Sequence, residues 1–170
     1  MPSVDGIRIV PTHERYVEGL NRAHDIVARE RRYIGFLEAP PVESTRQYVL
    51  HILTGEGVQF VALDANDEVV GWCDITRRPM EGFRHAGRMG MGLPAYRGRG
   101  LGRRLLSETI RAAHAMGLER VELEVFASNL AAIALYRKLG FVVEGTKKRV
   151  RKLDGAYDDD VLMALLLDER

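Results

Sequence analysis

The chain has 170 residues, the length of one ordinary domain, and its 25 basic and 24 acidic residues leave a formal net charge of +1. Hydrophobic residues make up 46% and charged residues 29%, which is the profile of a soluble globular protein rather than a disordered one. This charge balance excludes a general attraction to nucleic acid or to an anionic membrane, so any anion site has to be local. We expect a single domain over 1–170.

The single cysteine, Cys73, permits no intrachain disulfide. It lies in an apolar run and is expected to pack in the core rather than to act as a nucleophile. The N-terminus lacks the basic start and apolar stretch of a signal peptide. The longest apolar run, 161–167, is too short to span a bilayer. We therefore expect a cytoplasmic protein.

The first third of the chain alternates between strand and helix patterns. Residues 7–11 alternate like a short strand, and apolar residues at helical spacing follow over 16–27. After a proline-containing break, Ser44 and Gln47 have the spacing of a capping box. This pair predicts that a second helix begins at Ser44 and ends at a Gly-Glu-Gly run.

The remaining predicted elements, in chain order, are strands at 58–64, 69–77 and 84–94, a helix at 101–116, a strand at 120–126, a helix at 128–141 and two final strands joined by a tight turn at 154–155. The strand at 84–94 has the weakest pattern because it contains three glycines. One mixed sheet covered by helices, an α/β (α+β) fold, accommodates this order.

Residues 96–106, YRGRGLGRRLL, place three glycines and four arginines just before a predicted helix. In such a turn, backbone N–H groups and the positive end of the helix dipole converge on one point, and glycines let a ligand approach closely. The stretch lacks the Gly-Lys-Ser/Thr of a P-loop. It also fails the dinucleotide fingerprint, because Arg103 replaces the third glycine. We predict a phosphate or diphosphate site, with a solvated basic turn as the alternative.

A second stretch lies thirty residues further on. In this order and spacing, R-G-R-G-L-G and N-L-A-A-I-A-L-Y-R-K-L-G-F resemble the GNAT superfamily of acyl-CoA-dependent N-acyltransferases. Positions that match the two family motifs are Arg97, Gly100, Gly102, Asn129, Ala132, Tyr136, Lys138, Gly140 and Phe141. The resemblance is tight over 84–141. It implies a largely antiparallel sheet of six to seven strands flanked by about four helices, with the fourth and fifth strands splayed apart.

The resemblance also implies acetyl-CoA as co-substrate and no metal. The turn would cradle the diphosphate, and the fourth strand, which carries a bulge in the family, would offer backbone N–H groups to the thioester carbonyl. The residues assigned to the cofactor on this basis are Met91, Leu93, Arg97, Gly98, Arg99, Gly100, Leu101, Gly102, Arg103, Asn129, Ala132 and Tyr136. Substitution of Gly92 by Val is expected to raise the KM for acetyl-CoA.

By the same resemblance, Tyr136 would protonate the departing CoA thiolate, a role that suits a phenol because it is protonated at neutral pH. Family members often use a glutamate on the fourth strand to take the amine proton, and this strand offers His85 but no carboxylate. His85 and Asp74 are the two candidate bases. A solvated strand-end charge is the alternative interpretation of Asp74, and Glu38 is ranked below both.

The expected function is transfer of an acetyl group to a primary amine of a small molecule, such as an amino acid, polyamine or antibiotic, by direct attack in a ternary complex. The alternatives are acetylation of a protein N-terminus or lysine and, in another class, a non-catalytic module that senses acyl-CoA. The acidic run 158–160 could lie near a cationic substrate, although a solvated turn is favoured. A homodimer fits the family, and no motif identifies the acceptor.

Overall fold

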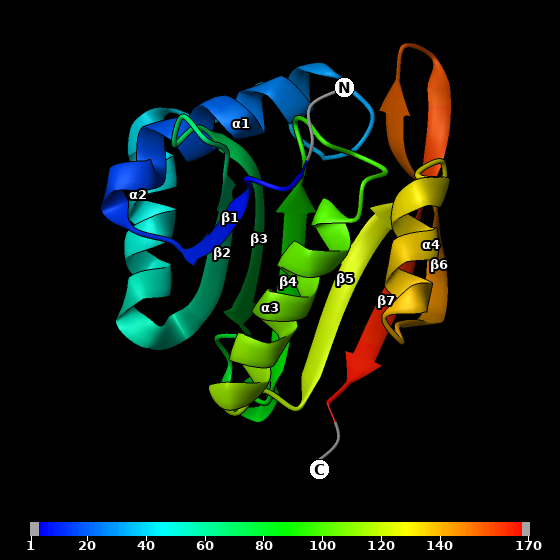
Figure 1. The fold of residues 1–170 in the computed structure, drawn as a ribbon. Coiled ribbons are helices and arrows are strands. Elements are labelled where there is room, and N and C mark those ends of the chain that lie inside the picture. The colour runs from blue at the N-terminus through cyan, green and yellow to red at the C-terminus, as the bar shows by residue number, and fades with distance from the viewer. Residues whose placement is uncertain (1–3, 168–170) are drawn as a thin grey trace.

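The computed structural model describes residues 4–167, which form one seven-stranded sheet in the order β1-β2-β3-β4-β5-β7-β6 (Figure 1). The elements, in chain order, are β1 (Arg8–Pro11), α1 (Val17–Arg29), α2 (Val42–His51), β2 (Gly57–Leu63), β3 (Val69–Arg77), β4 (Ala86–Gly92), α3 (Leu101–Ala115), β5 (Arg120–Phe126), α4 (Leu130–Lys138), β6 (Val142–Leu153) and β7 (Ala156–Leu166). Neighbouring strands are antiparallel except β4 and β5, which are parallel. The predicted fold class and element order are confirmed.

Two hydrophobic clusters lie on opposite faces of the sheet, because successive side chains of a strand point to opposite sides. Cys73 and Ile75 of β3 belong to the cluster under α3 and α4, whereas Trp72 belongs to the cluster under α1 and α2. Figure 1 shows α3 and α4 in front of the sheet, with α3 along β4 and β5. The burial of Cys73 confirms its predicted packing role.

The strands β4 and β5 diverge. Their ladder has only three pairs, from Ala86↔Arg120 to Arg88↔Glu122, although both strands continue for several residues. The predicted slot is therefore confirmed. The expected bulge in β4 is wrong, because its register with β3 runs without a shift as far as Gly92. On its other edge, β5 stays paired with β7 over its whole length, from Arg120 to Phe126.

Two predicted turns have different outcomes. The capping box is wrong, because α2 begins at Val42 and the Ser44 N–H donates to the Pro41 carbonyl within the first turn. Proline holds φ near the helical value and so favours an earlier start. The tight turn between β6 and β7 is confirmed: Asp154 and Gly155 have φ of 49° and 81°, as a type I′ hairpin requires.

Candidate functional site

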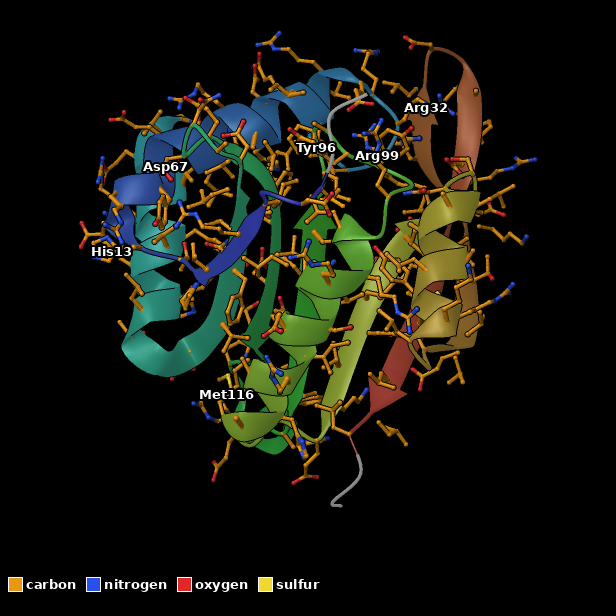
Figure 2. All side chains as sticks on the ribbon, viewed as in Figure 1. His13, Arg32, Asp67, Tyr96, Arg99 and Met116 are labelled. Carbon is orange, nitrogen blue, oxygen red and sulfur yellow. The ribbon has the colours of Figure 1, made fainter. Side chains whose placement is uncertain are left out.

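The glycine-arginine turn leads directly into α3. Gly98 and Gly100 have φ of 73° and 82°, in the left-handed region, and a Cβ at either position would meet nothing within 4 Å. Gly100 is the N-cap residue of α3 and has no capping side chain, so the first helical N–H groups can face an anion. Figure 2 shows Tyr96 and Arg99 at the end of the molecule opposite Met116. The turn thus has a backbone conformation compatible with the predicted cradle.

Three residues assigned to the cradle have other surroundings. A Cβ at Gly102 would lie 3.3 Å from the side chains of both Leu93 and Leu135, so this glycine lets α3 pack closely against α4. The Leu101 side chain is fully buried in the core, which leaves only its backbone to face a ligand. Arg103 lines a cavity of about 590 Å³ between α3 and β1.

The Arg97 guanidinium does not point freely toward the cradle. It makes a bidentate ion pair with Glu30, the residue directly after α1, at 2.5 and 2.6 Å, and it lies 4.4 Å from the Tyr33 ring centre. The ion pair raises the pKa of Arg97. The loop after α1 is also tied to the tip of the β6–β7 hairpin, because Arg31 pairs with Asp154 at 3.0 Å. The loop, the cradle and the hairpin tip therefore meet at one end of the molecule (Figure 1).

The backbone of β4 presents an open edge to the slot. The Ala86 carbonyl accepts a hydrogen bond from the Arg78 N–H, which directly follows β3. The His85 carbonyl accepts two, from the N–H groups of Glu119 and Arg120 where β5 begins. Backbone groups alternate in direction along a strand, so those of Met89 and Met91 point toward β5. The ladder with β5 has ended by then. The backbone groups predicted at Met91 thus lie along the open edge, whereas Leu93 follows the last residue of β4.

Tyr136 projects from α4 into the core beside the slot. Its residue is 7% exposed, and its ring lies 5.8 Å from that of Phe141. Burial, and secondarily the nearby Cys73 thiol, raises the pKa of the phenol, so the hydroxyl stays protonated. Asn129 caps α4, since its Oδ1 accepts from the Ala132 N–H at 3.3 Å. This capping role adds a structural function to the predicted ligand contact.

Asp74 is 7% exposed, so it is not a solvated strand end. The Tyr48 hydroxyl of α2 donates to its Oδ1 at 2.6 Å, and Gln59 Nε2 donates to its Oδ2 at 3.4 Å. Burial raises the pKa of Asp74 to about 6, against the opposing effect of these two hydrogen bonds. Asp74 pairs with Gly90 of β4, where a Cβ would lie 3.5 Å from Oδ1. The carboxyl group therefore lies over β4, two residues past its last pair with β5.

The other candidate bases are not brought to this position. His85 is exposed and precedes β4 at the end that is still paired with β5. Five residues of strand separate it from Gly90, a distance of about 16 Å at ~3.3 Å per residue. Glu38 is an exposed loop residue that lies 3.8 Å from Arg29. Of the three candidates, the structure places Asp74 alone beside the open edge.

The acidic run 158–160 is not a solvated turn but part of β7. Asp158 pairs with Arg151 at 3.1 Å, and Asp159 pairs with Lys148 at 3.0 Å. The third member, Asp160, is 7% exposed, and burial raises its pKa. Local ion pairs therefore account for the first two carboxylates.

Sequence reasoning missed Tyr48, Gln59 and Arg88. Gln59 had a usable signal, because a hairpin with strand ends at 64 and 69 places residue 59 opposite Asp74, as observed. Tyr48 reaches Asp74 across the sheet face, a contact that leaves no local pattern. Arg88 lies on the predicted fourth strand, but its sequence neighbours do not show that this strand separates from β5 after it.

Two further properties concern residues 4–167, the part of the chain that the structure describes. No group of three or more His, Cys, Asp or Glu side chains there could hold a metal ion. None of the helices in the same range is long and apolar enough to cross a membrane.

Comparison with known proteins gives consistent matches. The model of the acetyltransferase (GNAT) family matches residues 20–141. An L-methionine sulfoximine/L-methionine sulfone acetyltransferase from Pseudomonas aeruginosa is 37% identical over 110 residues, and the match spans 64% of this chain and 64% of that relative's length. The L-amino acid N-acetyltransferase AaaT from Escherichia coli is 28% identical over 154 residues, which cover 88% and 91% of the two chains.

Solved structures agree. A GNAT-family acetyltransferase from Streptococcus pneumoniae superposes with a TM-score of 0.88 at 26% identity, over 95% of this chain and 99% of that one. The YncA structure from Salmonella typhimurium has a TM-score of 0.89 at 23% identity, over 97% and 96%, and shows the shared fold. Because the family model matches more than half of this chain, the chain belongs to the acetyltransferase (GNAT) family.

Proposed function

We propose that the chain transfers an acetyl group from acetyl-CoA to the amino group of a small molecule, with amino acids as the acceptor class, by direct attack in a ternary complex. The relatives named above act on amino acids, which supports this acceptor class. One observation carries the proposal: the open edge of β4 has a buried carboxyl group over one face and a buried phenol beside the other.

The residues present fit the donor. The glycine turn and the uncapped start of α3 would hold the diphosphate, and the open edge of β4 would bond the amide groups of the pantetheine arm. When bound, acetyl-CoA supplies an activated acetyl group as a thioester. Backbone N–H groups of β4 that point into the slot would orient the thioester carbonyl and polarise it.

Asp74 would take the proton that the attacking amine must lose. With a pKa of about 6, its carboxyl group is ionised at neutral pH and can still accept a proton readily. Tyr48 and Gln59 hold the carboxylate in place. The three heavy atoms nearest to a Cβ built on Gly90 all belong to Asp74, so the missing side chain leaves room for the amine there.

Tyr136 would act on the leaving group. Its hydroxyl is protonated at neutral pH and can donate that proton to the sulfur of the departing thiolate. The phenolate left on Tyr136 would take up a proton from solvent before the next turnover. The amine proton thus goes to Asp74 on one face, and the thiolate receives a proton from Tyr136 on the other.

The test is acetyl-CoA-dependent release of free thiol with a panel of amino acids, polyamines, aminoglycosides and N-terminal peptides. Wild type should turn over amino acids, and Tyr136→Phe should lower kcat by about 100-fold. Tyr157→Phe, at an exposed position of β7, is the control and should match wild type. Turnover of peptides alone would indicate a protein acetyltransferase. No turnover, with acetyl-CoA still raising the Tm, would indicate an acyl-CoA sensor.

A further inference from the structure

A cavity of about 360 Å³ lies between the end of β3 and the start of β4. Its lining residues are Thr76, Arg77, Arg78, Pro79, Met80, Phe83 and Arg88. Thr76 and Arg88 are paired across the two strands, and each is two residues from a member of the Asp74–Gly90 pair. Residues two apart in a strand share a face, so the cavity lies on the same face of the sheet as the Asp74 carboxyl group.

Two of the three arginines that line the cavity are already engaged. The Arg77 guanidinium donates to two backbone carbonyls, at 2.6 and 2.8 Å, and so fixes the turn after β3. The Arg78 guanidinium pairs with Glu122 of β5 at 3.0 Å. Both guanidinium groups are therefore held by partners within the protein.

Arg88 differs from both. Its side chain is 58% exposed, and its ion-pair contact with Glu124 spans 3.7 Å, beyond hydrogen-bond distance. Glu124 has a closer partner in Lys147, at 2.9 Å. Arg88 therefore presents a positive charge to the cavity that Glu124 compensates only weakly, at the residue where β4 leaves β5.

The opposite wall is apolar. Met80 and Phe83 are 59% and 49% exposed, which is a large exposure for side chains of this kind. The cavity thus combines a cation and an apolar wall, and the Asp74 carboxyl group lies two residues further along the same face of β3. A molecule that carries an amine, an anion and an apolar group matches all three.

We infer that this cavity is the acceptor subsite, in which Arg88 binds the carboxylate of an α-amino acid while its amine lies beside Asp74 and its apolar side chain contacts Met80 and Phe83. This inference rests on the proposed function and narrows its acceptor class to amino acids with apolar side chains. A polyamine would place a second cation near Arg88, and a peptide N-terminus has no carboxylate beside its amine.

The test compares L-methionine with L-methioninamide, which differs in lacking the carboxylate. Arg88→Gln should raise the KM for methionine by about 10- to 100-fold, as expected for loss of a charge-assisted hydrogen bond, with a much smaller change in kcat. The KM for the amide should stay within about twofold. Arg88→Lys should recover part of the methionine affinity. Arg111→Gln, which removes an exposed arginine on α3, should match wild type.

A second variant tests the same subsite in the opposite direction. Glu124→Gln removes the carboxylate that faces Arg88 and should lower the KM for methionine while leaving that for the amide unchanged. Equal effects of Arg88→Gln on both acceptors, or none on either, would overturn the subsite. So would wild-type turnover of polyamines or peptides without turnover of methionine, although acetyl transfer would stand. Absence of thiol release with every amine would instead refute acetyl transfer itself.

Discussion

Cys73 and Asp74 are consecutive residues of β3, and their side chains lie on opposite faces of the sheet. Cys73 belongs to the cluster that contains Tyr136 of α4, and Asp74 accepts a hydrogen bond from Tyr48 of α2. One peptide step thus separates the surroundings of the proposed acid from those of the proposed base. Strand alternation keeps a group that must stay protonated apart from one that must ionise.

Asp74→Asn should lower kcat by about 100-fold, because an amide cannot accept the amine proton. In wild type, kcat should fall as the pH drops below about 6, where the carboxyl group becomes protonated. The variant should lose this acid limb. The pH dependence of kcat at saturating acceptor measures both effects. His85→Ala is the control, and loss of the limb there would transfer the base role to His85.

The same substitution should stabilise the protein above pH 6. The pKa of Asp74 is about 6 when folded against an ordinary 3.8, so its contribution is absent below about pH 4 and becomes fully unfavourable above pH 6. The expected gain for Asp74→Asn is up to about 3 kcal/mol at pH 8, falling toward zero at pH 4. The new amide can also donate to Gln59 Oε1, which is buried without a partner. Urea unfolding at both pH values tests this, and lower stability at pH 8 would contradict it.

Gly100→Ala should raise the KM for acetyl-CoA several-fold. A φ of 82° disfavours any residue with a Cβ by about 1 kcal/mol, so the cradle would relax and its N–H groups would turn away. Gly117→Ala, at φ 85° beyond the other end of α3, is a matched control with the same strain. Both should lose similar stability in thermal unfolding. An equal rise in KM for the two would show that the cradle has no special role.

Gly92→Val, expected from the sequence to raise the KM for acetyl-CoA, is a poor test of the slot. A Cβ at this position would lie 2.1 Å from the Trp72 ring, so the substitution would displace a core side chain. Its main effect should be a loss of stability of about 2 kcal/mol or more through overpacking. A Tm equal to that of wild type would contradict this.

Glu30→Gln should tighten acetyl-CoA binding by about threefold to fivefold, since it releases Arg97 and removes a negative charge near the diphosphate. Titration calorimetry at low and high salt measures the change, which salt should reduce. Glu18→Gln, on the same helix, is the control. Weaker binding in Glu30→Gln would instead mean that the ion pair positions Arg97 for the diphosphate.

The sequence predicts the fold well because its signals are local. Helical spacing, strand alternation and the Asp154-Gly155 turn each identify an element without reference to the rest of the chain. The error at Ser44 is also local, since Pro41 gives an earlier helix start than the capping pattern indicates. The glycines at 98 and 100 could be assigned to the cradle because a left-handed turn before a helix leaves a compositional trace.

The candidate site was harder to predict from the sequence than the fold, because it depends on contacts between elements that are distant in the chain. The burial of Asp74 requires α2 to bring Tyr48 across β3, and the pairing of Arg97 requires the end of α1 to lie beside the turn. No periodic pattern in the sequence predicts either of these contacts. As a result, the Arg97 guanidinium is paired with a carboxylate and does not face the predicted cradle freely. The Asp74 carboxyl group is buried, whereas a solvated strand end was the alternative interpretation.

Peptide groups and side chains along β4 respond differently to mutation. The slot is lined by peptide groups, which are the same whatever residue occupies the position, whereas the adjoining cavity is lined by side chains such as Thr76 and Arg88. If the proposed sites are correct, substitutions in the cavity would alter which amine is accepted, while the peptide groups proposed to hold the acetyl donor would stay the same. In the proposed enzyme, point mutations would therefore change the specificity for the acceptor more readily than the specificity for the acetyl donor.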